Sequence, residues 1–241
     1  MDRLIYLSMS GAKASLQRQD VLSNNLANAS TNGFRAEMAA FRAVPVLGSG
    51  ASTRVFALES TVGYDDKAGP LQITGRELDV AMMGKSWLAV QGLDGTEAYT
   101  RAGSLQVSPE GQLVTAGGLP VQGDGGPISI PAGAQVSIAD DGTINTTVGN
   151  ARPQQAGRLK LVTPDAALTR GSDGLFRAAQ GDLQADPLAR VQSGALEGSN
   201  VGPVETMVAM IAAARQFEQQ MKSLQGAEQR EQAASRLLSP Q

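Results

Sequence analysis

The sequence has 241 residues, enough for one large domain or two small ones, and a formal net charge of −3. It contains no Cys and no His, which excludes disulfide bonds, thiolate or imidazole zinc sites and every nucleophilic mechanism that needs Cys or His. The acidic balance argues against a protein that binds nucleic acid, and so few catalytic designs remain that we expect a non-enzyme without cofactors or metals.

The first residues carry the pattern of an amphipathic helix. Apolar residues recur there at spacings close to the helical period: Ile5, Met9, Ala12, Leu16, Leu22 and Leu26. We predict one helix of about 25 to 28 residues. It ends near Ser30-Thr31-Asn32-Gly33, because Asn32 or Gly33 can adopt the left-handed conformation that closes a helix. The sequence shows no ordinary secretory signal and no run of about 20 apolar residues, so we expect no direct membrane insertion.

Residues 35–74 show no clear element. Residues 34–41 are compatible with an extended segment or with a short helix. Pro45, Gly48-Ser49-Gly50 and a polar run to Gly69-Pro70 follow. We therefore expect a connector between the N-terminal helix, with its signature in residues 1–34, and the next domain.

The middle of the chain, residues 75–195, has the composition of an antiparallel β domain. Short runs typical of strands are residues 78–82, 87–90, 105–107, 129–130, 136–138, 159–162 and 175–177. Turn signals fall between them: Asp94-Gly95, Pro109-Glu110-Gly111, Gly117-Gly118, Asp141-Gly142 and Asp173-Gly174.

Two segments of this domain resemble ligand loops, and both are better interpreted as turns. Gly123-Asp124-Gly125-Gly126 is followed by Pro127 and a strand-like run, so it lacks the helix N-terminus that a phosphate-binding loop needs. Asp140-Asp141-Gly142-Thr143 lacks the further carboxylates of a calcium loop. Carboxylate pairs such as Asp65 with Asp66 are expected by chance among 23 acidic residues.

The C-terminal segment, residues 196–241, mirrors the first. Apolar residues step by three or four along it: Val204, Met207, Ile211, Ala214, Phe217, Met221 and Leu224. Pro203 is compatible with a first helical turn, and Asn200 or Gly202 can cap it. Gly226 weakens the pattern, and residues 228–236 are polar enough to fray in isolation.

Such apolar stripes most often form intramolecular core. Here they are narrow, as in a coiled-coil seam, and they lie at the extreme ends of the chain. We therefore expect them to pack against partner helices. The predicted fold class is α+β, with long N- and C-terminal helices that form a coiled-coil-like base and a central antiparallel β-rich domain.

Two terminal motifs resemble those of the bacterial flagellar rod and hook proteins. The first is Asn24-Asn25-Leu26-Ala27-Asn28-Ala29-Ser30-Thr31-Asn32-Gly33-Phe34. The second is Leu196-Glu197-Gly198-Ser199-Asn200-Val201, followed by residues 207–211 and by Arg215-Gln216-Phe217-Glu218. Trp87-Leu88-Ala89-Val90 and Tyr99-Thr100-Arg101-Ala102-Gly103 are similar to the central domain of the family, so the resemblance covers nearly the whole chain.

The resemblance implies a structural subunit of the basal-body rod that polymerises through its terminal helices and transmits torque. Implied partners are other rod subunits, copies of the same chain and the flagellar type III export apparatus, and the implied location is the periplasmic part of the basal body. Asn25, Asn28 and Asn200 are expected to cap helix ends or bridge subunits, and Gly33 to permit the turn out of the helix. The expected assembly residues are Ile5, Met9, Leu16, Leu22, Asn25, Leu26, Asn28, Gly33, Phe34, Glu197, Gly198, Asn200, Val201, Met207, Ile211, Arg215, Phe217 and Met221.

Alternatives remain open at this point. Arg35-Ala36, residues 42–46 and residues 217–222 are most similar to the proximal-rod branch of the family. The distal-rod branch is the nearest competitor. A periplasmic β-domain binding module on a helical stalk would show a pocketed β domain, and a peptidoglycan hydrolase would show a carboxylate in a cleft.

Overall fold

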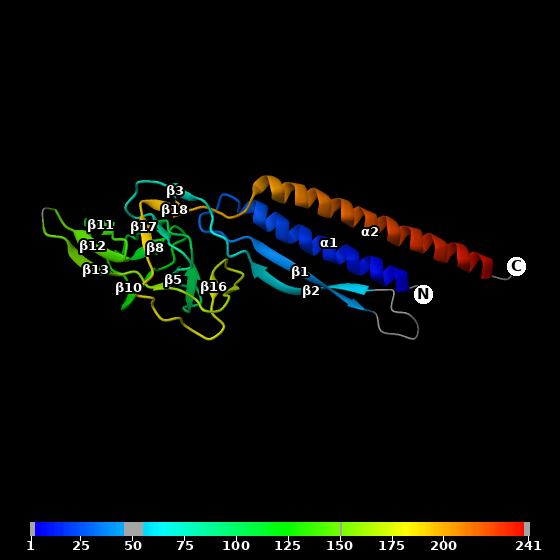
Figure 1. The fold of residues 1–241 in the computed structure, drawn as a ribbon, viewed down its shortest axis with the longest axis horizontal. Coiled ribbons are helices and arrows are strands. Elements are labelled where there is room, and N and C mark those ends of the chain that lie inside the picture. The colour runs from blue at the N-terminus through cyan, green and yellow to red at the C-terminus, as the bar shows by residue number, and fades with distance from the viewer. Residues whose placement is uncertain (1–2, 46–54, 150, 239–241) are drawn as a thin grey trace. The chain divides into compact units, whose positions relative to one another are not determined.

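A computed structural model describes residues 3–45, 55–149 and 151–238 (Figure 1). The chain forms two compact units. The first, called here the helical unit, comprises Met1–Ala29, Ala36–Asp65 and Val201–Gln241. The second, the β unit, comprises Ser30–Arg35 and Asp66–Asn200.

Two long helices dominate the helical unit. Helix α1 spans Arg3–Ala27, which confirms the predicted length, and α2 spans Pro203–Leu238. Helix α2 begins at the predicted Pro203, and the Gly202 carbonyl accepts the first helical hydrogen bond, from Thr206 N, at 2.9 Å. It then continues past Gly226, because a single glycine costs a long helix only about 1 kcal/mol.

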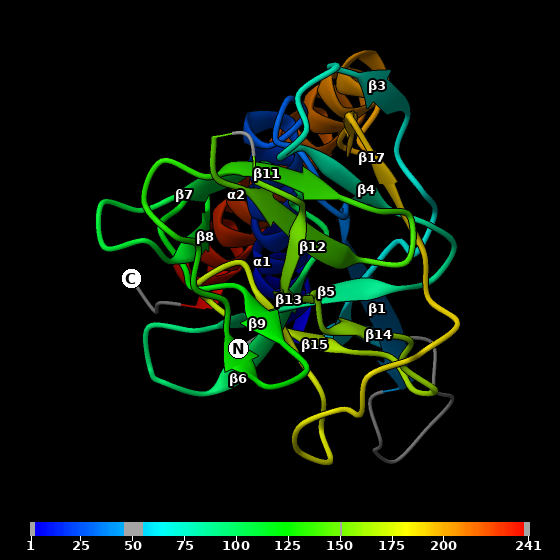
Figure 2. The same ribbon diagram turned by 90° about the vertical axis from the view of Figure 1, so that its left-hand side faces the viewer.

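Small residues line the contact between α1 and α2, which run side by side (Figures 1 and 2). The buried positions of α1 include Ser8, Ala12 and Ser15. Those of α2 include Thr206, Ala213 and Ala227, which stand at multiples of seven residues. At Gly11 even an added Cβ would lie 3.0 Å from the Gln220 side chain. Close packing of the two helices therefore depends on small side chains.

The segment expected as a simple connector instead contains a long β-hairpin. Strands β1 (Glu37–Pro45) and β2 (Val55–Tyr64) pair antiparallel from Glu37↔Tyr64 to Pro45↔Val55, with a register shift between Ala40 and Phe41. Both strands contact α1 within the helical unit. The hairpin was not evident in the sequence because its stability comes from cross-strand pairing and from this helix, which local composition does not encode.

The β unit consists of short antiparallel strands, as predicted. The largest sheet has the order β14-β5-β6-β16-β15, and β11-β12-β13 form a second sheet, seen together in Figure 2. Paired strands β3–β18, β4–β17, β7–β8 and β9–β10 complete the unit. The strands are β3 (Leu71–Ile73), β4 (Val80–Met82), β5 (Trp87–Gln91), β6 (Glu97–Thr100), β7 (Leu105–Val107), β8 (Leu113–Thr115), β9 (Gln122–Gly123), β10 (Gly126–Pro127), β11 (Gln135–Ile138), β12 (Thr143–Thr147), β13 (Gln154–Arg158), β14 (Leu161–Val162), β15 (Thr169–Arg170), β16 (Phe176–Arg177), β17 (Val191–Ser193) and β18 (Ala195–Glu197).

Aliphatic side chains fill the core of the β unit. Completely buried members include Val80, Leu88, Val90, Leu105, Leu113, Val121 and Ile144. The single Trp of the sequence, Trp87, packs on Phe176 with ring centroids 4.7 Å apart. Several small sheets contribute side chains to this core. The β unit is therefore stabilised by packing between the sheets rather than by the backbone hydrogen bonds of one continuous sheet.

The predicted turns of the β unit are confirmed. Gly95, Gly111, Gly118, Gly142 and Gly174 all have φ between 78° and 83°. The Gly123–Gly126 cluster joins β9 to β10 as a tight turn rather than a ligand loop. Residues 129–130 do not form the predicted strand, because Ser129 makes only an isolated bridge to Gln112.

Candidate assembly interface

Asn25, near the end of α1, is used within the chain itself. Its side chain is 6% exposed, Nδ2 donates to the Glu37 carbonyl at 2.9 Å, and Oδ1 accepts from Glu37 N at 2.8 Å. The amide therefore satisfies both backbone groups of the first residue of β1, as a neighbouring strand would. Asn25 neither caps α1 nor lies free on the surface.

Asn28 closes the last turn of α1, as expected. Its backbone N donates to the Asn24 carbonyl at 3.1 Å, and its Nδ2 donates to the same oxygen at 2.9 Å. The Asn24 carbonyl thus accepts two hydrogen bonds from Asn28, one from its backbone and one from its side chain.

Gly33 occupies a position in the β unit that only glycine fits. Its φ is 71°, and its N donates to the Glu197 carbonyl at 2.7 Å. A Cβ at this position would lie 2.2 Å from the carbonyl carbon of Arg101. Gly33 has the expected left-handed conformation, but it does not close the helix, because α1 ends six residues earlier at Ala27. The close approach of the Arg101 backbone is a further reason for glycine at this position.

Glu197 is the centre of a buried ionic cluster, which we call the Glu197 cluster and define as Arg35, Arg101 and Glu197. The three residues are 1–3% exposed. Glu197 Oε2 accepts a hydrogen bond from Arg101 Nε at 2.6 Å and forms an ion pair with Arg101 Nη2, also at 2.6 Å. Glu197 Oε1 accepts from Gly69 N at 2.9 Å and lies 2.6 Å from Arg35 Nη1. The contact with Arg35 is an ion pair without an aligned hydrogen bond.

The Arg101 guanidinium also binds three backbone carbonyls. It donates to those of Met82 at 2.7 Å, Gly84 at 3.0 Å and Ser86 at 2.7 Å, and it lies over the Trp87 ring at 5.8 Å. Burial lowers the pKa of Arg101, while the Glu197 carboxylate acts in the opposite direction. The saturated hydrogen bonding of Arg101 indicates a structural role for the cluster.

The residues next to Glu197 bind the end of the first sequence signature and residues 67–70 of the connector. Gly198 N donates to the Pro70 carbonyl at 2.8 Å. Asn200 Nδ2 donates to the Lys67 carbonyl at 2.9 Å, and Asn200 N donates to the Phe34 carbonyl at 3.3 Å. The buried Phe34 ring lies under the Arg170 guanidinium at 4.5 Å. Residues 30–35, 67–70 and 197–200 are therefore gathered at one place in the β unit.

Other expected assembly residues are exposed on the terminal helices. Met9 and Leu16 of α1 are 61% and 45% exposed, and Met207 and Ile211 of α2 are 50% and 56% exposed. Arg215 is exposed, whereas Leu22, Leu26, Phe217 and Met221 are half-buried and Val201 is buried. The side chain of Ile5 lies outside the described residues.

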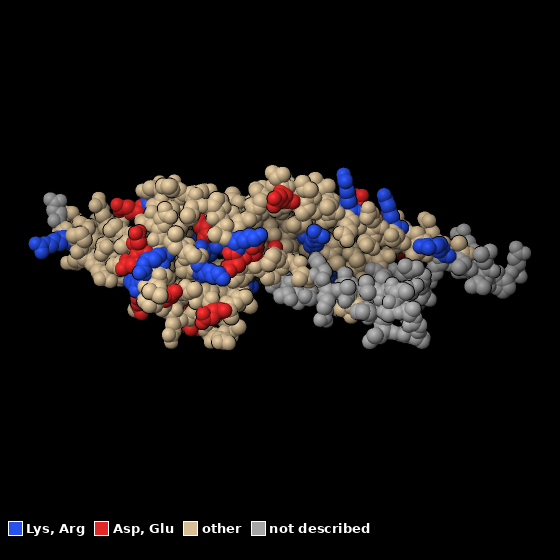
Figure 3. All heavy atoms as spheres, viewed as in Figure 1, with Lys and Arg blue, Asp and Glu red and all other residues tan. Residues whose placement is uncertain are grey.

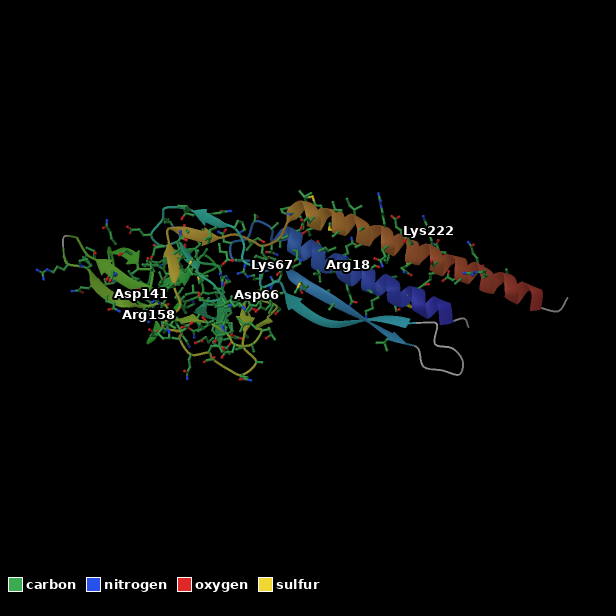
Figure 4. All side chains as sticks on the ribbon, in the orientation of Figure 1. Arg18, Asp66, Lys67, Asp141, Arg158 and Lys222 are labelled. Atoms are coloured by element: carbon green, nitrogen blue, oxygen red, sulfur yellow. The ribbon has the colours of Figure 1, made fainter. Side chains whose placement is uncertain are left out.

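The exposed apolar positions of α2 form a stripe over its first turns: Val204, Met207, Val208 and Ile211. A groove of about 530 Å³ borders this stripe. Its lining residues are Val208, Ile211, Ala212, Arg215, Gln216, Gln219 and Gln220. Charged residues such as Arg18 of α1 and Lys222 of α2 lie outside the stripe (Figure 4). The helical unit thus has a small-residue seam between its helices and a second, apolar face open to contact.

Asp141, in the segment that resembles a calcium loop, serves in a turn. Asp141 Oδ1 accepts from Thr143 N at 3.0 Å, and Arg158 Nε donates to the Asp141 carbonyl at 2.9 Å (Figure 4). Its bonds to Thr143 lower the pKa of Asp141, opposite to the shift that a general acid needs. Within the described residues, no three acidic side chains are close enough together to bind a metal ion.

Charged side chains are distributed differently over the two units on the face seen in Figure 3. Lys, Arg, Asp and Glu lie close together over the β unit, whereas on the helical unit charged side chains of both signs are fewer and stand among uncharged ones. Among the described helices, none combines the length and hydropathy needed to cross a bilayer.

Sequence reasoning quoted Arg35, Arg101 and Val208 within motifs but gave none of them a role of its own. The pairing itself could not be found, because Arg101 and Glu197 are 96 residues apart in the sequence.

Comparisons with known proteins match both the ends and the centre of the chain. Residues 5–35 match the family described as flagella basal body rod protein, residues 81–146 the flagellar hook protein FlgE/F/G D1 domain, and residues 192–237 the flagellar basal body rod FlgEFG protein C-terminal family. Over 250 residues, the chain is 49% identical to the flagellar basal-body rod protein FlgF of Salmonella typhimurium LT2 and to that of Escherichia coli K12, with 99% of each chain covered. It is 31% identical to the rod protein FlgG of Bacillus subtilis 168, with 92% of this chain and 94% of the relative covered.

Proposed function

The chain belongs to the family of flagellar basal-body rod proteins and is a structural subunit of the rod, and we propose that it occupies the proximal rod, as a counterpart of FlgF. The higher identity to FlgF than to FlgG supports the proximal assignment, with 49% against 31%. Other rod components are its partners, and its work is mechanical rather than catalytic.

The observation that carries the proposed mode of assembly is the apolar stripe of α2. Met207, Val208 and Ile211 are 50–63% exposed although the adjacent seam against α1 is packed. Complete burial of such a side chain stabilises an interface by about 1.5 to 3 kcal/mol. We propose that the stripe packs against terminal helices of neighbouring subunits, copies of this chain or other rod proteins.

Under this proposal the terminal helices form the coiled-coil-like base of the assembly. Buried positions of α2 at multiples of seven residues support it, because a heptad repeat is the spacing of coiled-coil contacts. Met9 and Leu16 of α1, also seven residues apart and exposed, add a second apolar surface. Torque then passes through the packed helices.

We propose further that the chain reaches the periplasmic part of the basal body through the flagellar type III export apparatus, without a cleaved signal. The absence of Cys fits passage of an unfolded chain that must not cross-link. Recovery of the chain in the proximal part of isolated basal bodies would support the placement, and its restriction to the distal part would contradict it.

Ile211→Glu tests the stripe. A carboxylate placed in an apolar contact is costly to bury, so we expect at least a 10-fold loss of the chain from isolated basal bodies and a loss of swimming. Gln225→Glu is the matched control, because it places the same side chain at an exposed polar position of α2. Unchanged helicity of both purified variants would exclude misfolding. Normal rods built from the Ile211→Glu chain would refute the role of the stripe.

A further inference from the structure

The chain passes from one unit to the other at four places: residues 29–30, 35–36, 65–66 and 200–201. Each of these places lies within a few residues of a backbone group that is hydrogen-bonded to Glu197 or to Asn200. Gly33 N donates to the Glu197 carbonyl, and Asn200 N donates to the Phe34 carbonyl. Asn200 Nδ2 binds the Lys67 carbonyl, and Gly69 N donates to Glu197 Oε1.

The chemistry at this point is unusual for a structural protein with so few buried charges. Two guanidinium groups and one carboxylate are almost completely removed from water, and the carboxylate forms an ion pair with each of the two arginines. Removal of one partner from such a cluster leaves an uncompensated buried charge, which costs far more than loss of an ordinary contact. The Glu197 carboxylate holds Arg35, Gly69 and Arg101 directly. The backbone of Glu197 and the adjacent Asn200 hold Gly33, Phe34 and Lys67, so these bonds depend on the position of the same segment.

We propose that the Glu197 cluster is a latch that fastens all four chain crossings to the β unit as one cooperative element. Docking of residues 30–35, which lead to both α1 and β1, then requires residues 197–200, which lead to α2. The two ends of the chain cannot be seated independently. This inference concerns the single chain and does not depend on the proposed mode of assembly.

Amide hydrogen exchange of the full-length chain, measured residue by residue, tests the latch in Glu197→Gln. We expect the protection of Gly33, Gly69, Gly198 and Asn200 to fall together by about 100-fold or more. Protection of Val136 and Ile144, in the β11–β13 sheet, should change by less than about 3-fold, because local opening does not require global unfolding. Glu97→Gln is the matched control: it breaks the ion pair with Lys160 elsewhere in the β unit and should leave the four amides unchanged.

Two outcomes would overturn the proposal. One is independent behaviour, in which Gly69 loses protection while Gly33 and Asn200 keep theirs. The other is an equal fall at Val136 and Ile144, which would make the cluster part of the general core. Arg35→Met provides the same comparison with a smaller perturbation if Glu197→Gln does not fold, because the contact between Arg101 and Glu197 stays intact.

Asn32-Gly33, the single Asn-Gly step of the sequence, provides a chemical readout. Asn-Gly steps are prone to deamidation. In that reaction the Gly33 backbone N loses its proton and attacks the side-chain carbonyl carbon of Asn32, and ammonia leaves. Water then opens the succinimide to aspartate or isoaspartate. In the folded chain that N–H is bound to the Glu197 carbonyl, so opening of the latch must precede attack. Mass spectrometry should show faster deamidation at Asn32 in Glu197→Gln than in Glu97→Gln, and equal rates would contradict a latch.

Discussion

The helical unit and the β unit differ in where their large apolar side chains lie. In the β unit, aliphatic residues such as Leu88 and Ile144 are completely buried, and the charges at its centre are paired. In the helical unit, the buried seam consists of small residues, while large apolar side chains such as Met9 and Ile211 are exposed. A unit that keeps its best apolar surface outside is built to complete its core with partners.

This difference predicts where the chain tolerates change. The β unit should unfold cooperatively and by itself, because its core and its ionic cluster lie within it. The stability of the helical unit should depend on the concentration of partners, because its exposed stripe is buried only in an assembly. Substitutions at residues that fix the backbone, one in each unit, therefore test this difference in stability between the two units.

The largest effect in the β unit is expected for Gly33→Ala. A residue with a side chain costs about 1 to 2 kcal/mol in the left-handed conformation, and displacement of the Arg101 backbone adds to this cost. We therefore expect the free energy of unfolding to fall by about 2 to 4 kcal/mol. Gly118→Ala is the control, because its φ is 79° but an added Cβ meets nothing within 4 Å. Denaturant unfolding followed by Trp87 fluorescence measures both. Equal losses would show that the close approach at Gly33 has no cost.

The same positions show how much of the fold the sequence could predict. Local signals were sufficient for both helices and for the turns at Gly95, Gly142 and Gly174, because helical periodicity and Asp-Gly steps act over a few residues. The β1–β2 hairpin was missed because its pairing partners are joined through a Pro- and Gly-containing segment and are supported by α1.

For the candidate assembly interface, sequence motifs identified important residues but not the contacts that these residues make. Glu197, Asn25 and Gly33 were identified through motifs as assembly residues, yet their contacts in this chain are internal. A buried carboxylate that pairs with arginines distant in sequence leaves no local pattern. Exposed Met207 and Ile211 match the expectation of a free apolar stripe, and their contact with partners stays a prediction.

A smaller effect is expected for Asn25→Ala in the helical unit. The change removes two hydrogen bonds to the backbone groups of the half-buried Glu37, so we expect a loss of about 1 to 3 kcal/mol. Faster amide exchange at Glu37, with α2 amides unaffected, is the measurement. Ser23→Ala, at an exposed position of the same helix, is the control. Protection of Glu37 equal to that of the parent chain would show that the amide does not fix β1.

The smallest effect concerns acid, and it belongs to the turns of the β unit. Hydrogen bonds with Thr143 lower the pKa of Asp141, and the Arg177 side chain lowers that of Asp173. Because the folded-state pKa values lie below the unfolded ones, both carboxylates stabilise the β unit above about pH 4, and this stabilisation is lost as the pH falls through the folded values.

The two carboxylates can be separated by salt, because their pKa values are lowered for different reasons. Asp173 is held first of all by a charged partner that is partly exposed, so about 0.5 M NaCl should weaken its contribution. Asp141 is held first of all by neutral hydrogen-bond donors of Thr143, which salt screens little. We therefore expect Asp173→Asn to flatten the acid dependence of Trp87-monitored unfolding mainly at low salt, and Asp141→Asn to flatten it equally at both. The opposite order would mean that long-range charge, rather than turn geometry, controls the acid stability of the β unit.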